Sequence, residues 1–506
     1  MVNAMTLAFV RQDLVDNPYL SEVIIVLYII TLLILFTFGA HGFVMVYHYW
    51  KQRGTHSLKP STRPEPIVTI QLPLYNELYV INRLIDAVCA LDYPRERLEV
   101  QVLDDSTDET VEAVAQTVAA YRARGYDIHH IRRGGRQGFK AGALQHGLAL
   151  ARGDYVAIFD ADFVPQPSFL RETLPFFEDS NIGLVQTRWE HLNGEYSLLT
   201  RAQAIALDGH FVIEQEVRNK AGYFINFNGT GGIWRKSAIE DAGGWNSDTL
   251  TEDLDLSYRA QLKGWKFKYL VDFTSPAELP AEVTALKSQQ FRWTKGAIET
   301  ARKILPQLWR SDFPLRVKIH STFHLTNNIV FPFILLAGIL NVPLVYIKQK
   351  GLHEEYFMFM SVFVLAFIGS FLLYLLSQRA VYGDWRRRIL LFPLFMAGSM
   401  GFAVNNSRAV FQALFKRKSE FVRTPKYRIE QKEDSWRSKK KYTQAKLDWV
   451  VLAEVLLALY CLFGVASSIY FLEIAAVPFQ LLYFLGFAFV SALSIKHALD
   501  ARKARP

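Results

Sequence analysis

Long apolar segments constrain the fold of this 506-residue chain more than any other feature. The first runs from about Leu20 to Tyr47 and contains no charged residue after Glu22. A membrane-spanning helix needs roughly 20 predominantly apolar residues, so this segment can cross a bilayer with some tilt. It lacks a basic leader and a small-residue cleavage site, which favours a retained helix over a signal peptide.

The charges around the apolar segments predict how they are oriented. Acidic residues precede the first segment and basic residues follow it, which places the following residues in the cytoplasm by the positive-inside rule. Further apolar segments occur at about 322–347, 356–377, 389–404, 448–472 and 476–494. The third is weakened by Gly398, Gly401, Asn405, Asn406 and Arg408. We expect a re-entrant or interfacial segment there, near 389–413, and roughly five spanning helices. With this topology the basic stretch at 416–441 and the basic C-terminus both stay cytoplasmic.

The composition agrees with a membrane protein and argues against nucleic acid as a partner. Hydrophobic residues make up 51% of the chain, and the formal net charge is +9. The basic residues cluster beside apolar runs, which favours an anionic membrane surface and phosphorylated substrates. The two cysteines, Cys89 and Cys461, support neither a disulfide framework nor a zinc site.

Between about Pro66 and Pro280 the pattern changes to alternating strands and helices. Strands are expected at 68–72, 100–103, 128–131 and 156–159, and helices at 84–91, 110–124 and 140–151. This alternation predicts an α/β domain with a mostly parallel sheet covered by helices. Ligands of such sheets bind beyond the carboxyl ends of the strands.

Two carboxylates follow the last of these strands. In Val156 to Phe163, residues Asp160 and Asp162 are two positions apart, so in an extended chain both side chains point the same way. Such a pair suits a hard cation, Mg²⁺ or Mn²⁺, that also binds phosphate oxygens. The alternative is a strand followed by an acidic turn with no ligand.

Five more motifs carry candidate functional residues. Together with Asp160-Ala161-Asp162 they are Tyr75-Asn76-Glu77, Asp104-Asp105-Ser106, Lys140-Ala141-Gly142, Thr251-Glu252-Asp253 and Gln289-Gln290-Phe291-Arg292-Trp293. In this order they resemble the processive family-2 glycosyltransferases of the cellulose synthase superfamily, particularly its cellulose-synthase-like A and C branches and their bacterial relatives. The resemblance covers about residues 65–310.

The resemblance implies a GT-A-type cytosolic domain inserted between transmembrane helices. The expected divisions are an N-terminal transmembrane helix (1–50), the glycosyltransferase domain (51–296), amphipathic interface helices (297–320) and a C-terminal membrane region (321–506). The expected activity is inverting β-glycosyl transfer that elongates a glucan, mannan or glucomannan from UDP-glucose or GDP-mannose. The expected location is an inner, plasma or Golgi-type membrane, with the catalytic domain facing the cytoplasm.

The resemblance also implies roles for the donor-binding residues. Asp160 and Asp162 would hold the metal against the phosphates, and Lys140 and Arg292 would add positive charge. The nucleoside would be bound by Tyr75, Glu77, Asp104 and Asp105. Only one aspartate of the adjacent pair is expected to make the main contact, and Asp105 is favoured. Alternatively, Lys140 is a solvated lysine at a helix start and the acidic run is a helix cap.

The remaining roles concern the acceptor. Asp253 is the expected general base, which takes the proton of the attacking hydroxyl. Trp293 is expected to stack on the acceptor sugar, or otherwise to anchor the chain at a membrane interface. Gln289, Gln290, Glu252 and Trp189 are the further acceptor-site candidates, and His210, His320 and His324 are assigned to packing.

A basic stretch at 416–441 resembles the gating loop of cellulose synthases. Its candidate residues are Phe421, Thr424 and Lys426, whereas Arg423 stands where that pattern has valine. The simpler interpretation is a positively charged cytoplasmic loop. Two other functions stay open: a non-processive transferase that makes a glycolipid, and a membrane scaffold or transport module whose sheet domain is regulatory. Sugar, linkage, primer and partner subunits are not predictable from these motifs.

Overall fold

The computed structural model describes residues 18–52, 65–351, 354–417, 419, 422–437, 439–442 and 447–503. The chain divides into two compact units, each described here by itself. One, the sheet unit, comprises residues 48–326 and 413–443. The other, the helical unit, comprises residues 1–47, 327–412 and 444–506.

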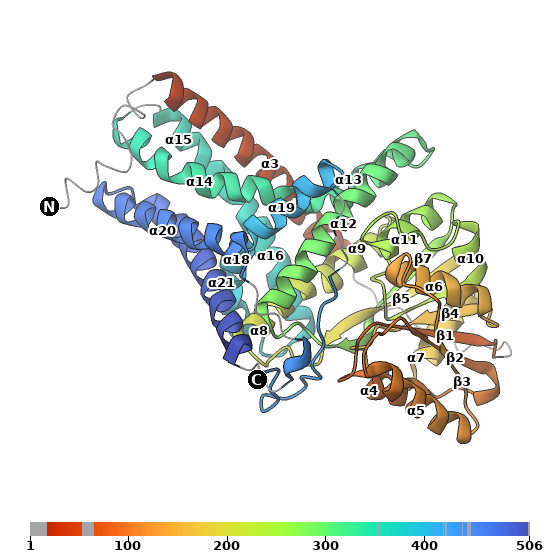
Figure 1. Cartoon of the computed structure of the whole chain (residues 1–506). Helices are drawn as coiled ribbons and strands as arrows, with labels where there is room; N and C mark the ends of the chain where they lie inside the picture. The colour runs from red at the N-terminus through yellow and green to blue at the C-terminus, as the bar shows by residue number, and fades with distance from the viewer. Residues whose placement is uncertain are drawn as a thin grey trace. The chain divides into compact units, whose positions relative to one another are not determined.

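A seven-stranded mixed sheet forms the centre of the sheet unit (Figure 1). Its order is β3-β2-β1-β4-β6-β5-β7. Neighbouring strands are parallel except where β6 runs antiparallel to both β4 and β5. The strands are β1 (Val68–Leu74), β2 (Leu98–Asp104), β3 (Asp127–Ile131), β4 (Tyr155–Ile158), β5 (Ile182–His191), β6 (Gly232–Arg235) and β7 (Lys266–Ala277). The predicted α/β architecture is confirmed, and the antiparallel β6 is an addition to it.

Helices cover both faces of the sheet, and each face has its own apolar core (Figure 1). Helices α4 (Ile81–Cys89), α5 (Thr110–Ala123) and α7 (Phe169–Thr173) contribute to one core, whereas α6 (Phe139–Leu150), α10 (Lys236–Asp241) and α11 (Glu252–Leu262) contribute to the other. Strand β1 shows why. Ile70 and Leu72 pack into the first core, while Gln71 between them points to the other face and bonds Gln101 of β2 at 3.0 Å.

Four further helices complete the sheet unit. They are α8 (Leu198–Asp208), which passes through a π-helical turn (Gly209–Glu214) into α9 (Gln215–Lys220), then α12 (Val283–Arg310) and α13 (Leu315–Thr326). Helix α12 is continuous through residues 296 and 297, where the sequence predicts the boundary between the glycosyltransferase domain and the interface helices. The residues before and after that boundary therefore belong to one rigid element.

Residues 422–442, called the covering segment below, pack onto the sheet unit through a small apolar core of their own. Tyr427, Ile429 and Trp436 are buried there with Ala281. The Tyr427 amide donates to Glu278 at 3.0 Å and its hydroxyl to Glu282 at 3.1 Å. Burial raises the pKa of Glu282 to about 7. The sequence predicts either a loop that resembles a gating loop or a basic cytoplasmic loop here, and the structure shows a segment docked on the sheet unit.

Four helices of the described part of the chain are long and apolar enough to cross a membrane: Tyr19–Lys51, Leu315–Gln349, Trp449–Tyr470 and Ile474–Ala501. A bent pair, Trp385–Gly401 and Ala403–Leu414, would be a broken span or a re-entrant loop, with an angle of 46° between its halves. The apolar segment expected at 356–377 is interrupted, and its longest apolar helix is Phe367–Val381. These features make the chain a membrane protein with four, or up to five, candidate spans.

The helical unit comprises most of α3 (Pro18–Lys51), then α14 (Val330–Gln349), α15 (Glu354–Met360), α16 (Val364–Val381), α17 (Trp385–Arg388), α18 (Phe392–Gly401), α19 (Ala403–Leu414), α20 (Trp449–Tyr470) and α21 (Val477–Lys503). Glycines let α18 and α21 approach closely. A Cβ on Gly401 would meet the carbonyl oxygen of Gly486 at 2.4 Å, and a Cβ on Gly486 would meet that of Ala397 at 2.1 Å. Small residues allow such backbone contact between apolar helices.

The docking of the covering segment can be tested with Trp436→Ala. Removing a buried tryptophan side chain from a packed core costs about 3–5 kcal/mol, so the segment should detach while the sheet stays folded. Limited trypsin digestion should then cleave within residues 422–442 at least tenfold faster than in the wild type. Replacing the exposed Trp309 by alanine is the control. Equal cleavage rates in Trp436→Ala and wild type would contradict the docked arrangement.

Candidate active site

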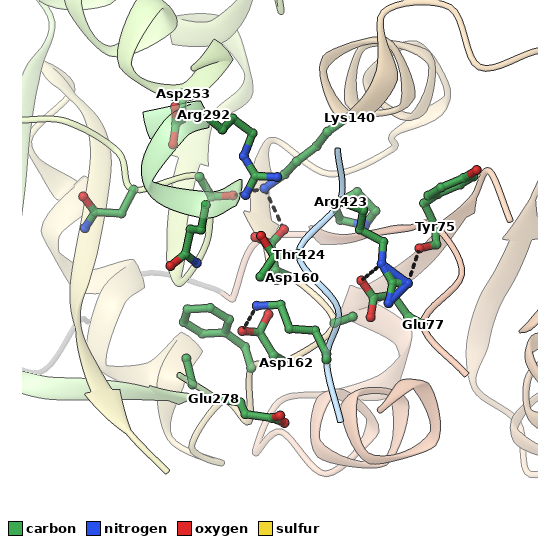
Figure 2. A pocket seen from close by; sticks show the side chains of 18 of the residues that line it. Tyr75, Glu77, Lys140, Asp160, Asp162, Asp253, Glu278, Arg292, Arg423 and Thr424 are labelled. Carbon is green, nitrogen blue, oxygen red and sulfur yellow. Dashed lines mark hydrogen bonds and ion pairs between the residues drawn. The ribbon is translucent and has the colours of Figure 1, made fainter. Parts of the chain in front are cut away.

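One cavity collects most of the predicted site residues at the carboxyl edge of the sheet (Figure 2). Strands β1, β2 and β4 are parallel neighbours, so the residues that follow them meet at this edge. The cavity is lined, among others, by Tyr75, Glu77, Asp105, Lys140, Asp160, Asp162, Trp189, Glu252, Asp253, Gln289, Arg292, Trp293, Thr424 and Lys426. Asp104 and Gln290 are not among the described residues that line it.

The turn after β1 positions Tyr75 and Glu77. Asn76 between them has a left-handed backbone with φ of 55°, which asparagine tolerates better than most residues. Its amide donates to Ser106 Oγ at 2.8 Å, and its side-chain oxygen accepts from the Thr107 amide at 2.9 Å. The turn is thereby fixed to the loop after β2. Burial raises the pKa of Glu77 to about 8, despite the nearby cations Arg423 and Lys426.

The adjacent aspartates after β2 have different surroundings. Asp104 is buried, and its carboxylate accepts from the Ser106 amide and from His130 Nε2, both at 2.8 Å. Burial raises its pKa, but these hydrogen bonds more than offset that effect and leave the pKa lowered. Asp105 lines the cavity instead, and Arg133 binds it through two bonds of 2.7 and 2.5 Å. The alternation of side chains along the strand therefore separates a structural aspartate from one that reaches the cavity.

Two arginines that the sequence analysis did not select complete this part of the site. Arg133 orients Asp105 and also donates to the carbonyl oxygens of Gln137 and Phe139, at 2.6 and 2.8 Å. Arg136 lines the cavity and stacks on Tyr75, with its guanidinium carbon 3.3 Å from the ring centroid. The signal in the sequence is the run Arg132-Arg133-Gly134-Gly135-Arg136, which directly follows a strand and precedes the helix that opens with Lys140.

Lys140 and Asp160 form an ion pair within the cavity (Figure 2). The Lys140 ammonium lies 2.6 Å from Asp160 Oδ1, and it also donates to the carbonyl oxygen of Gly229 at 2.9 Å. Burial alone would lower the pKa of Lys140, but Asp160 and Glu252 raise it above the ordinary value. The lysine is thus a partly buried group, 20% exposed, that pairs with a carboxylate of the cavity.

Asp253 is in the first turn of α11, where its carboxylate accepts a hydrogen bond of 2.8 Å from the amide of Leu254. Burial and the adjacent Glu252 raise its pKa to about 7, although Lys140 opposes the shift. Gly229 packs against it: at φ of +79° a Cβ on this glycine would meet Asp253 Oδ2 at 2.8 Å. The glycine-rich loop therefore forms a wall beside the predicted base.

Helix α12 brings Gln289, Arg292 and Trp293 to the cavity from the other side. Burial lowers the pKa of Arg292, and four carboxylates nearby, Glu252, Asp160, Asp253 and Asp162, oppose that shift. The rings of Trp293 and Trp189 lie 6.4 Å apart at their centroids. Together with Gln289 and His191 they give one end of the cavity aromatic walls.

The covering segment supplies three cavity residues (Figure 2). Lys426 forms an ion pair with Asp162, and Arg423 donates to the backbone oxygens of Tyr75, at 3.1 Å, and of Asn76. Arg423 Nε also lies 3.6 Å from Glu77. The arginine at this departure from the gating-loop pattern therefore binds the turn after β1. Phe421 lies outside the described residues.

Several cavity atoms indicate a polar ligand. Glu77 Oε2, Trp189 Nε1, Asn228 Nδ2 and Thr424 Oγ1 are buried, and the described residues offer them no hydrogen-bond partner. Buried polar atoms in folded proteins nearly always have one. Asp160 and Asp162 suit a divalent cation because they are oxygen donors that already attract two lysines. Among the described residues no group of three or more His, Cys, Asp or Glu side chains forms a metal site, so further ligands would come from substrate or water.

Residues 64–296 match the family described as "Glycosyltransferase like family 2", and this part of the chain is a family-2 glycosyltransferase domain. Over 268 residues the chain is 46% identical to glucomannan 4-beta-mannosyltransferase 1 of Oryza sativa subsp. japonica, covering 52% of this chain and 51% of that protein. It is 43% identical over 273 residues to glucomannan 4-beta-mannosyltransferase 2 of Arabidopsis thaliana, covering 52% and 51%. The chain spans about half the length of the curated relatives it matches. The predicted family resemblance is confirmed for this domain.

A solved structure shares the fold. The mannosyltransferase PcManGT from Pyrobaculum calidifontis, solved in complex with GDP-Man and Mn²⁺, superposes with a TM-score of 0.55 over 78% of this chain and 100% of its own. Its sequence identity is 18%. The predicted GT-A-type fold is confirmed.

The role of Arg133 can be tested with Gly142→Ala. A Cβ on Gly142 would meet the Gln137 carbonyl oxygen at 2.1 Å and Arg133 Nη1 at 2.5 Å, which displaces the arginine that orients Asp105. We expect nucleoside diphosphate binding to the purified protein to weaken about tenfold, since an oriented charge-assisted bond contributes about 1.5–3 kcal/mol. Gly134→Ala is the matched control, because nothing lies within 4 Å of its added Cβ. Equal affinities of the two variants would contradict this role.

Proposed function

We propose that the chain is a membrane-embedded, inverting β-glycosyltransferase that polymerises a polysaccharide from a nucleotide sugar. The observation that carries the proposal is the convergence of Asp160, Asp162 and Asp253 with Lys140 and Arg292 on one cavity of a family-2 domain. Such a set of charges fits a diphosphate leaving group, a metal and an attacking hydroxyl. The retention of every motif carboxylate argues against a purely regulatory or scaffold role.

The diphosphate end of the donor would bind where positive charge gathers. Asp160 and Asp162 would hold Mg²⁺ or Mn²⁺, which as a Lewis acid stabilises the charge of the leaving diphosphate. Lys140 and Arg292 would contact the phosphate oxygens, Arg292 through its planar fork. Lys426, which lies on Asp162, would move to a phosphate when the metal takes its place. Thr424 would then donate its buried hydroxyl to the same group.

The nucleoside end would bind at the turn after β1. Asp105, held in place by Arg133, would accept from N–H groups of the base, and Glu77 from hydroxyl groups of the ribose. Arg136 already covers the Tyr75 ring. The base would therefore contact the guanidinium plane of Arg136, with Tyr75 behind it.

The acceptor would approach from the aromatic end of the cavity. Pyranose rings stack their apolar faces on aromatic side chains, and Trp293 and Trp189 offer two such faces. Gln289 and Glu252 would bond acceptor hydroxyls. Asp253 would take the proton of the attacking hydroxyl as that oxygen displaces the diphosphate at the anomeric carbon, which inverts the configuration.

The names of the relatives favour mannose as a transferred sugar and a β-1,4 linkage. We therefore propose GDP-mannose as a donor, with UDP-glucose as the alternative, and a mannan or glucomannan backbone as the product. The candidate spans are consistent with export of the growing chain through the helical unit. The catalytic domain would face the cytoplasm, where nucleotide sugars are made.

The proposal is tested with the full chain purified in detergent and supplied with GDP-mannose or UDP-glucose. We expect release of nucleoside diphosphate, an insoluble or high-molecular-weight product that a linkage-specific glycanase degrades, and loss of activity with EDTA that Mn²⁺ or Mg²⁺ restores. A small lipid-soluble product would instead assign the chain to glycolipid synthesis. No turnover of either donor with oligosaccharide acceptors present would contradict the proposal.

The base assignment predicts the pH dependence. Asp253 must be deprotonated to accept a proton, and its raised pKa of about 7 places part of the population in the protonated form at neutral pH. The rate should therefore rise with pH on the acidic side, with a midpoint well above the ordinary aspartate value of 3.8, and then level off. Initial rates between pH 5 and 9 test this.

The same assignment predicts the effect of Asp253→Asn. General-base catalysis contributes about 10²- to 10⁴-fold, so transfer should fall by that factor while donor binding persists. The control is Asp248→Asn, which changes a half-exposed carboxylate five residues earlier that pairs with Lys303. Transfer by Asp253→Asn at the wild-type rate would exclude Asp253 as the base.

A further inference from the structure

Helix α12 carries an ion pair between a buried lysine and a partly buried glutamate directly after the residues that line the cavity. Lys295 follows Trp293 by two positions, and Glu299 is one turn further along. The Lys295 side chain is 1% exposed, and its ammonium lies 3.7 Å from Glu299. Burial lowers the pKa of Lys295 and raises that of Glu299. Neither residue lines the main cavity.

Lys295 holds the part of the chain that leads into the covering segment. Its ammonium donates to the carbonyl oxygen of Arg417 at 2.6 Å and to Ser419 Oγ at 2.7 Å. One turn beyond Glu299, Arg302 donates to the carbonyl oxygen of Ala413. One side of α12 thus binds the stem of the covering segment, defined as residues 413–419.

Glu299 holds a different segment, the turn that precedes the proposed base. Its carboxylate accepts the amide of Leu250 at 3.0 Å. The turn packs on α12 at the next residue too, since Thr251 Oγ1 lies 3.2 Å from Thr300 Oγ1. Gly296 makes this contact possible, because a Cβ there would meet Thr251 at 2.5 Å. Glu252 and Asp253 follow immediately in α11.

The pair also lies next to the main cavity without entering it. A second cavity is lined by Lys295, Glu299 and Ser419 together with Lys140 and Glu252. Lys140, Glu252 and Leu250 line both cavities. The ion pair is therefore separated from the proposed donor site by the residues that the two cavities share.

A role in stability alone explains the pair poorly. Taking two charges out of water is costly, and apolar residues of similar volume often replace a buried ion pair without loss of stability. What a charged pair adds is direction: the ammonium can only donate hydrogen bonds, and the carboxylate can only accept them. Here these partners come from two segments distant in sequence, at 250 and at 417–419.

We propose that Lys295 and Glu299 are a positioning pair that fixes the stem of the covering segment and the turn before Asp253 in their positions relative to each other. Through this pair, Arg423 and Lys426 of the covering segment and Asp253 of the turn take their places at the donor together. The inference rests on the proposed function, because it assigns the pair a role in the same transfer reaction. Neither residue touches the donor or the acceptor.

The test compares Lys295→Met, Glu299→Gln and the double variant in the full-length protein. Each single change should lower kcat for transfer about tenfold or more and increase the fraction of donor that is hydrolysed instead of transferred. Each single change leaves the other charge without its partner and should lower the thermal midpoint, so the rates are measured at a temperature at which every variant stays folded. The double variant should be no worse than the single variants, because the two residues act as one unit. Lys295→Arg should restore most of the transfer rate.

The control is Arg310→Met, which removes an exposed cation from the last turn of the same helix. Trypsin cleavage within residues 413–443 gives a readout that needs no activity, and Lys295→Met should accelerate it. The inference would be overturned if kcat, donor hydrolysis and the cleavage rate in the variants equalled those of the wild type. It would also be overturned if the loss of transfer rate in each variant only matched its fraction of unfolded protein. If the wild type turned over neither donor, the proposed function would fail, while unchanged cleavage in Lys295→Met would separately reject the coupling.

Discussion

The balance of charge inside one cavity governs the rest of the site. Seven carboxylates, those of Glu77, Asp105, Asp160, Asp162, Glu252, Asp253 and Glu278, line the cavity. Buried charges of one sign are costly unless opposite charges compensate them. Here the compensation comes from Arg136, Lys140, Arg292, Arg423 and Lys426, which residues 136–140, helix α12 and the covering segment supply. Three distant parts of the chain are thereby held around one point.

This balance also explains the raised pKa of Asp253. Asp160 has the Lys140 ammonium at 2.6 Å, whereas Asp253 has a carboxylate beside it and no cation in direct contact among the described residues. Burial therefore raises the pKa of Asp253 toward neutrality, where a carboxylate is a better proton acceptor. One cavity can thus hold carboxylates suited to binding a cation and also a carboxylate suited to accepting a proton.

Sequence patterns predicted the parts of this site that depend on periodicity. The strand ends and the Asp160 and Asp162 pair follow from spacing along the chain, and the structure places them together. Arg133 was missed because its place depends on how closely a loop packs against Gly142, and Arg136 because its place depends on its contact with the Tyr75 ring; spacing reveals neither. The choice between Asp104 and Asp105 depended on which face of β2 turned toward the cavity.

The covering segment shows a second limit. Its apolar residues Tyr427, Ile429 and Trp436 form no helical or strand pattern long enough to predict an element, so only its charge and its resemblance to a gating loop were visible in the sequence. Its docking depends on partners far away in sequence, such as Glu278 and Glu282. Strand β6 was missed for a related reason, since it has only four residues and pairs antiparallel with strands on both sides.

Helical geometry connects the catalytic motif to these distant segments. On α12, residues 289, 292 or 293, 296 and 300 recur at intervals of three or four, so they share a face that meets the cavity and the turn of Asp253. Residues 295, 299 and 302 have the same spacing on a neighbouring face, where Lys295 and Arg302 bind the stem of the covering segment and Glu299 binds the Leu250 amide. A rotation or shift of α12 would move both sets together. The helix therefore makes the position of the proposed base and that of the phosphate-facing lysine of the covering segment depend on each other.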